Sequence, residues 1–185
     1  MVLLESINIP LGSRAIDFSL KGTDEKIYSL EDFKGARALV IVFMCNHCPY
    51  VQAIWKRLVK LQARFEAEGV RFVGINPNLN PDYPEETFEK MKEYYARYNM
   101  NFPYLQDDLQ VVAKKYEAQC TPDIYVYDGE FELKYHGRVD DNWKNEDEVL
   151  KEDLSEALKA ILSGVDSERN QHPAMGCSIK WREDA

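Results

Sequence analysis

The spacing of apolar residues along the chain predicts strands that alternate with helices. Residues 36–44 are mostly apolar and rich in strand-forming side chains, which is typical of a strand buried on both faces. From residue 46 to 68 the apolar side chains recur at helical spacing, and Gly69 follows as a stop signal. Residues 70–76 repeat the buried-strand pattern. The first half of the chain therefore predicts a strand–helix–strand unit.

The second half continues this alternation and adds a hairpin. Pro84, followed by two glutamates, is a suitable start for the next helix. The remaining predicted elements are a short strand (102–107), a short helix (109–116), a hairpin (123–137) and an amphipathic helix (147–162).

This order of elements predicts an α/β fold, in which a central mixed sheet is flanked by helices on both faces. We expect one domain over residues 1–185, because no linker-like stretch divides the chain. Residues 1–36 read as an N-terminal extension of short strands and turns. Residues 164–185 show no regular pattern and are expected to form an irregular C-terminal tail.

Composition and charge narrow the classes of function. The chain has 185 residues, of which 45% are hydrophobic, and a net charge of −9 without a basic block. This argues against nucleic acid and anionic membranes as partners. No apolar run approaches the ~20 residues that span a bilayer, and the first ten residues lack the basic stretch of a signal peptide. We therefore expect a cytoplasmic protein, in which a disulfide is more often catalytic than structural.

Two of the four cysteines, Cys45 and Cys48, are close in sequence and lie where the predicted buried strand meets the predicted helix. A helix N-terminus favours an anion such as a thiolate. We therefore expect Cys45 to have a lowered pKa and to be the attacking sulfur. Cys48, one turn further, would close a disulfide with Cys45 and resolve the mixed disulfide.

The residues around the pair modify this expectation. A protonated His47 would stabilise the Cys45 thiolate further, although a solvated first-turn histidine with little effect is the alternative. Asn46 is neutral and adds no charge. Pro49 fits a first helical turn, where N–H groups lack partners. Asn46 and Pro49 are expected at the rim of the site.

Other uses of a CxxC pair fit this chain less well. Haem attachment requires a histidine directly after the second cysteine, and Pro49 occupies that place. Zinc would need two more ligands, for which Cys120, His172 and Cys177 are scattered candidates. We therefore expect neither a metal nor a cofactor. A non-enzymatic metal-binding or interaction module stays open as an alternative.

The strand–CxxC–helix unit, followed much later by "CTPDIYVYD", resembles the thioredoxin superfamily. In that family a proline after a residue such as threonine is cis and faces the CxxC. The resemblance gives this place to Pro122 after Thr121. It also implies that backbone groups before the proline pair with an extended partner chain. The implied partners are protein disulfides or dithiols, together with a reductase or other thiol system.

Further motifs resemble a peroxiredoxin-like branch, with a domain of the alkyl hydroperoxide reductase and thiol-specific antioxidant type. The N-terminal "AIDFSLKGTDEKIYSLEDFKG" resembles this branch. So do the segments "FMCNHCPYV", "GRVDDNW" and "PAMGCSIKW".

The chain departs from this branch where peroxide chemistry would be carried. Peroxiredoxins have Pro-x-x-x-Thr-x-x-Cys; counted back from Cys45, those places hold Ala38 and Val42, and from Cys48 they hold Ile41 and Cys45. Thiol–disulfide exchange is therefore the leading hypothesis, and a thiol-dependent peroxidase is the alternative.

A proton acceptor is also missing from its usual place. Thioredoxin has a buried acid on the strand before the CxxC, and residues 38–44 contain none. His47, Asp123 or a water are the candidates for this base.

Four further residues are candidates for the site. Cys120, two places before Pro122, is either a third redox thiol or an inert buried cysteine. Cys177 would pair with Cys45 or Cys48 if the tail folds back, and is otherwise a plain tail residue. Arg138 could raise the local positive potential and Trp143 could help to dock a partner; the alternative is a solvated turn with one packed tryptophan.

Overall fold

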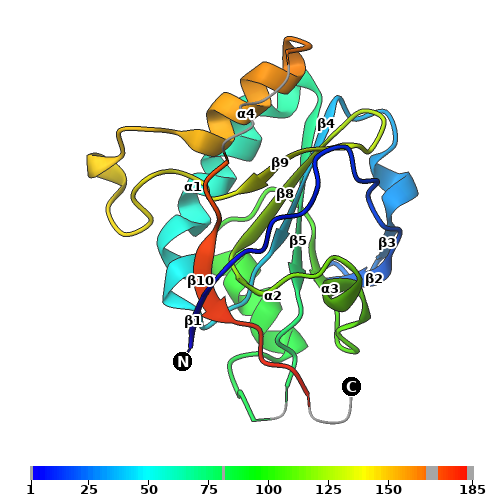
Figure 1. Ribbon diagram of the computed structural model, residues 1–185. Helices are drawn as coiled ribbons and strands as arrows, with labels where there is room; N and C mark the ends of the chain where they lie inside the picture. Colours follow the sequence, from blue (N-terminus) through cyan, green and yellow to red (C-terminus); the bar gives the residue numbers. More distant parts are fainter. Residues whose placement is uncertain (1, 81, 166–170, 183–185) are drawn as a thin grey trace.

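A seven-stranded mixed sheet forms the centre of the computed structural model, which describes residues 2–80, 82–165 and 171–182 (Figure 1). The central strand β4 (Ala38–Phe43) pairs in parallel with β5 (Val70–Asn76) and antiparallel with β8 (Asp123–Asp128). The outer strands, which complete the order β3-β2-β6-β5-β4-β8-β9, are β3 (Ile27–Ser29), β2 (Ser19–Gly22), β6 (Tyr104–Gln106) and β9 (Leu133–Gly137).

Helices cover both faces of this sheet. On one face, Val40 and Val42 pack with α1 (Pro49–Phe65), α2 (Phe88–Arg97) and α4 (Asp153–Leu162). On the other, Leu39 and Ile41 pack with α3 (Val111–Lys115) and the short 3-10 helix Leu30–Phe33. Every residue of β4 is buried, as its unbroken apolar run predicted. The predicted fold is confirmed.

The helices α1, α2 and α4 start later than their periodicity suggested. The first begins at Pro49 instead of residue 46, with Cys48 as its N-cap residue, and Gly69 ends the short helix Glu66–Glu68 behind it with a φ of +88°. The second begins at Phe88 instead of Pro84, because the hydroxyl of Thr87 caps it by accepting a hydrogen bond from the N–H of Lys90. The last starts at Asp153, behind the separate 3-10 helix Glu146–Glu148.

The C-terminal tail is not irregular, which corrects the prediction. Strand β10 (Met175–Ser178) lies between β1 (Leu3–Glu5) and β7 (Cys120–Thr121) in a second, three-stranded antiparallel sheet (Figure 1). Backbone pairing holds this strand, so side-chain periodicity gave no signal for it. Residues 166–170 and 183–185 of the expected tail lie outside the described residues.

No helix in the described part of the chain is long and apolar enough to cross a membrane.

Candidate active site

The cysteine pair and the Thr121–Pro122 loop meet behind the C-terminal end of β4. The Sγ atom of Cys45 lies 3.2 Å from Oγ1 of Thr121. The Cys48 sulfur lies 3.1 Å from the backbone carbonyl oxygen of Thr121, to which its protonated form donates. Both cysteines are fully buried thiols, and the Thr121–Pro122 peptide bond is cis. The structure thus brings Thr121 and the cis bond that follows it next to both cysteines.

Thiolate character belongs to Cys48. A hydrogen bond from the Cys45 thiol is the largest cause, and the pKa of Cys48 falls to about 5 although burial opposes this. The thiol and the backbone N–H of Cys177 act in the same direction, as does the backbone N–H of Val51 in the first turn of α1. One of these donors, the N–H of Val51, belongs to the helix N-terminus, which favours an anion.

The predicted lowering of the pKa of Cys45 is wrong. Complete burial raises the pKa of Cys45 well above its usual value, and the hydrogen bond to Cys48 and the charge of Glu86 add to this effect. The prediction assumed that the helix starts directly after Cys45. Because α1 starts at Pro49, its N-terminus acts on Cys48 instead.

Glu86 is a buried acid at the site that the sequence interpretation missed. Its carboxylate accepts hydrogen bonds from the backbone N–H groups of Asn46 (3.1 Å) and His47 (2.8 Å) and from the side-chain amide of Asn76 (2.8 Å). Oε1 of Glu86 also lies 2.5 Å from Nδ1 of His47. The sequence showed Glu86 only as an acidic residue at a helix start. Its carboxylate instead holds the turn between the two cysteines.

The three polar or proline residues around the pair differ in exposure. Asn46 is not a rim residue, which corrects the prediction: it is fully buried, and its side chain bonds to the hydroxyl of Tyr104 and the carbonyl of Glu85. His47 is half-buried and stacks on Tyr83, with ring centroids 5.4 Å apart. Pro49 is exposed. Nδ1 of His47 faces the Glu86 carboxylate, so the polar partner of this ring is Glu86.

The position of Asp123 argues against its role as a base for the cysteines. Asp123 lies on the face of β8 that carries Tyr125, opposite to Ile124, which packs in the same cluster as the cysteines. Its carboxylate is 2.7 Å from Nε2 of the buried His136. An oxygen of Glu86, in contrast, lies within 4.8 Å of the Cys45 sulfur. Glu86 is therefore the acid near the cysteine pair that can serve as the proton acceptor missing from β4.

Cys45, His47 and Glu86 also have the residue types of a metal site, with their ligand atoms within 4.8 Å of one another. The Glu86 oxygens already accept from the N–H groups described above, however, and a cation would compete for them. A cation would also need the Cys45 thiolate, which the raised pKa disfavours. This arrangement fits a hydrogen-bonded turn better than a metal centre.

The other two cysteines differ in their relation to the pair. The Cys120 thiol points to the carbonyl oxygens of Pro122 (3.5 Å) and Ala174 (4.0 Å), and burial, with the nearby charge of Asp123, raises its pKa. These are the surroundings of an unreactive thiol. Cys177, on β10, hydrogen-bonds to Cys48 and shares its apolar cluster. The tail thus folds back over the site.

The loop after β9 borders the site from the other side. The ring of Trp143 packs on that of Tyr50, with centroids 4.1 Å apart. A cavity of about 270 Å³ lies beside this pair, and its walls include Pro122, Arg138 and Trp143. Nε of Arg138 donates to Asp153 at 2.8 Å, so that its charge is compensated. Of the two residues singled out here, Trp143 has the better position to contact a partner.

A buried ion pair fixes this loop. Nη1 of Arg57 donates to Asp140 at 2.5 Å and to the carbonyl of Asn142 at 2.9 Å, and Nη2 donates to the carbonyl of Trp143 at 2.5 Å. Both charged side chains are more than nine-tenths buried. One arginine on α1 therefore holds the segment that carries Trp143 against the helix that carries Cys48.

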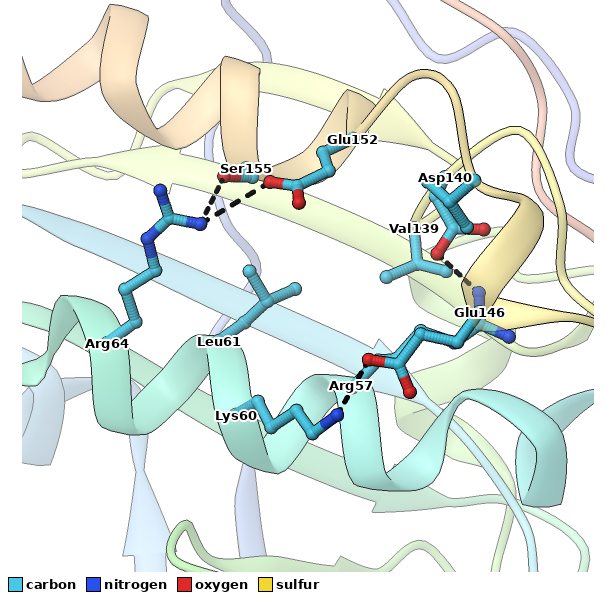
Figure 2. A pocket seen from close by; sticks show the side chains of 10 residues that line it. Arg57, Lys60, Leu61, Arg64, Val139, Asp140, Glu146, Glu152 and Ser155 are labelled. Atoms are coloured by element: carbon cyan, nitrogen blue, oxygen red, sulfur yellow. Dashed lines mark hydrogen bonds and ion pairs between the residues drawn. The ribbon is translucent and has the colours of Figure 1, made fainter.

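A second cavity, of about 310 Å³, lies beyond this ion pair between α1 and α4 (Figure 2). Its charged walls pair with one another: Lys60 with Glu146 at 2.7 Å, and Arg64 with Glu152 at 3.4 Å. No cysteine lines it. The cysteine pair therefore remains the candidate site.

Comparison with known proteins agrees with this geometry. Residues 11–139 match the model of the AhpC/TSA family. The chain belongs to the AhpC/TSA family. The matched segment includes Cys45, Cys48 and the Thr121–Pro122 loop, whereas Cys177 lies outside it. A search of curated proteins gave no match.

Solved structures include close relatives of this AhpC/TSA family member. An uncharacterized conserved protein from Geobacillus kaustophilus is 42% identical, with a TM-score of 0.95 over 100% of this chain and 99% of that chain. A hypothetical protein from Sinorhizobium meliloti is 40% identical, with a TM-score of 0.92 over 97% and 98%. A putative thiol:disulfide interchange protein from Chlorobium tepidum is 19% identical, with a TM-score of 0.64 over 84% and 99%, and shows that the thioredoxin-like fold is shared. Family and fold together support a thioredoxin-like redox role.

Proposed function

We propose that the protein is a thiol–disulfide oxidoreductase in which Cys48 attacks and Cys45 resolves. The observation that carries this proposal is the position of Cys48. It is the N-cap residue of α1, and its pKa is lowered to about 5, mainly by the hydrogen bond from the Cys45 thiol. At neutral pH such a sulfur is a thiolate, which is the nucleophile of disulfide exchange. The roles are the reverse of those expected from the order of the two residues in the chain.

The proposed cycle moves two electrons from the protein to the substrate. The Cys48 thiolate attacks one sulfur of a substrate disulfide; a Cys48–substrate bond forms, and the other substrate sulfur leaves as a thiolate. Cys45 then loses its proton and attacks the Cys48 sulfur. The second substrate thiolate leaves, and a Cys45–Cys48 disulfide remains. A dithiol of a cellular thiol system would restore the reduced pair.

The second step requires a proton acceptor, because Cys45 is held as a thiol. The buried Glu86 carboxylate, within 4.8 Å of the Cys45 sulfur, is the acid or base that fits this task. The hydroxyl of Thr121, 3.2 Å from Cys45, can donate to the developing thiolate. Glu86 and Thr121 therefore act on the resolving sulfur of Cys45. The attacking sulfur of Cys48 lies at the N-terminus of α1 instead.

The proposed substrate is a protein disulfide presented on an extended segment. The cavity beside Pro122 is walled by Trp143, whose ring offers apolar area to a side chain next to the reacting sulfur. Replacing Trp143 by alanine should therefore raise KM for a protein disulfide and leave the rate with a small disulfide nearly unchanged.

Reduction of insulin disulfides by the purified, dithiothreitol-fed protein tests the proposal. C48S should lose activity completely. C45S should turn over more slowly, because the resolving thiol is gone. C120S, which changes a buried thiol outside the cycle, is the matched control and should retain activity. Retention of activity by C48S would refute the assignment of the attacking sulfur.

A thiol peroxidase is the second candidate, favoured by family membership and by one contact. The hydroxyl of Thr121 stands beside Cys45, although the threonine of the peroxiredoxin motif is absent from β4. The raised pKa of Cys45 opposes attack on peroxide by this sulfur and leaves Cys48 as the one that would react. Stopped-flow mixing of the reduced protein with hydrogen peroxide separates the two candidates, since a peroxidase would lose thiols rapidly and the proposed oxidoreductase would not.

A further inference from the structure

Strand β10 occupies the edge at which the family resemblance expects a partner chain. Cys177 stands directly opposite Thr121 in the antiparallel pairing of β10 with β7. A Cβ atom at Gly176 would overlap the carbonyl group of Thr121 and lie 2.9 Å from the nitrogen of Pro122. The backbone of β10 therefore lies against the loop before the cis proline, as an added partner strand would.

This strand brings a thiol to the attacking sulfur. The Cys48 sulfur lies 3.1 Å from the carbonyl oxygen of Thr121, and Cys177 is the residue paired with Thr121. Cys177 is 3% exposed, shares one apolar cluster with Cys45 and Cys48, and forms a side-chain hydrogen bond with Cys48. Cys48 thus has one thiol on the CxxC turn and a second one on β10.

We propose that Cys177 is a third redox-active thiol, which forms a reversible disulfide with Cys48; this rests on the function proposed above. A substrate that reaches Cys48 displaces β10 locally and forms the mixed disulfide. When β10 returns, Cys177 loses its proton to the solvent and attacks the Cys48 sulfur. The Cys48–Cys177 bond forms, and the substrate leaves as a thiolate. Cys45 can then attack Cys48 in turn, which yields the Cys45–Cys48 disulfide and frees Cys177 without further oxidation.

The C45S chain isolates this step, because Cys177 is then the neighbouring thiol left to Cys48. The reduced, full-length C45S protein is mixed with oxidised glutathione, and samples are quenched with acid, alkylated and digested with trypsin. The thiol-bearing peptides are residues 38–56, 116–134 and 170–180, which carry Cys48, Cys120 and Cys177 respectively. Intact mass and peptide mass then report which sulfurs are joined.

We expect glutathione to add to peptide 38–56 and then to leave, as a disulfide to peptide 170–180 appears. In C45S/C177S the glutathione adduct should persist at least about tenfold longer, since the intramolecular thiol is gone. C45S/C120S should behave as C45S. C45S/C177A serves as a second variant, and circular dichroism confirms that each chain is folded.

Two results would overturn the assignment. One is an adduct that lives equally long with and without Cys177. The other is a cross-link from peptide 38–56 to 116–134 instead of 170–180. Insulin reduction by the unmodified protein tests the underlying oxidoreductase separately. If insulin is reduced and no Cys48–Cys177 disulfide forms, only the third thiol is refuted; if that disulfide forms without insulin reduction, only the proposed substrate reaction is refuted.

Discussion

Oε1 of Glu86 lies 2.5 Å from Nδ1 of His47 and accepts the backbone N–H of the same residue at 2.8 Å. One buried carboxylate thereby holds both the side chain and the backbone of the residue between the two cysteines. The turn that carries the cysteines depends on an acid 39 positions further along the chain. This dependence makes Glu86 a sensitive position for both folding and thiol chemistry.

Replacing Glu86 by glutamine should destabilise the reduced protein by about 1–3 kcal/mol, because the new amide group turns a donor toward N–H groups that need an acceptor. It should also lower the pKa of Cys45, since the charge of Glu86 is one of the causes that raise it. Urea unfolding measures the first effect, and the ultraviolet absorbance of the thiolate against pH measures the second. E85Q alters an exposed neighbour and should change neither.

The sequence was a good guide wherever apolar periodicity reflects burial. The unbroken apolar run before Cys45 predicted the buried strand β4, and the apolar spacing beyond Cys48 predicted α1. The CxxC and the Thr121–Pro122 pair are far apart in the sequence, and the resemblance to the thioredoxin superfamily predicted that they meet. These elements depend on local patterns, which a single sequence displays.

The features that the sequence did not reveal depend on contacts between distant segments. Glu86 is buried because Asn46 and His47 supply its donors, and an acid at a helix start gives no sign of this. Strand β10 exists because its backbone pairs with β1 and β7. The pKa of Cys45 was misjudged for the same reason, since the first residue of α1 decides which sulfur feels the helix N-terminus.

Replacing Arg57 by alanine should cost about 3–5 kcal/mol, because it leaves the Asp140 carboxylate buried without its counter-charge. R64A, on the same helix, removes an ion pair whose partners are about half exposed and should cost less than about 1 kcal/mol. Figure 2 shows both arginines with their acidic partners, and chemical denaturation of the two variants compares their stabilities. R57A should also release Trp143, which its fluorescence would report. Equal stability of the two variants would contradict the role assigned to the buried pair.

The reduction potential of the Cys45–Cys48 pair should change with pH by an amount that depends on how many of the two thiols are protonated. Over most of the pH range we expect Cys48 to be ionised and Cys45 to be protonated. The pKa of Cys48 is about 5 and that of Cys45 lies well above the usual 9.0. Between these values, reduction takes up two electrons and one proton, so the potential should fall by roughly 30 mV per pH unit. Below the pKa of Cys48 the slope should double.

The same shift affects stability. Folding lowers the pKa of Cys48 from the usual 9.0 to about 5. Between these two pH values the Cys48 sulfur is protonated in the unfolded chain and ionised in the folded one. The free energy of unfolding of the reduced protein should therefore rise with pH in this window, and the gain should be lost as the pH falls through about 5.

Redox buffers at several pH values measure the potential. A double slope throughout would show that Cys48 remains a thiol.

Replacing Gly176 by alanine should separate β10 from β7, because the new Cβ atom meets backbone atoms of Thr121 and Pro122 that cannot turn aside. Cys48 would then lose both its cover and the hydrogen bonds from Cys177. Alkylation of Cys48 should become at least about tenfold faster at a pH where it is ionised, since access then no longer requires local opening. S178A, a change on the same strand at a half-buried hydroxyl that Lys180 contacts, should leave the alkylation rate unchanged. An unchanged rate in G176A would mean that β10 does not restrict access to Cys48.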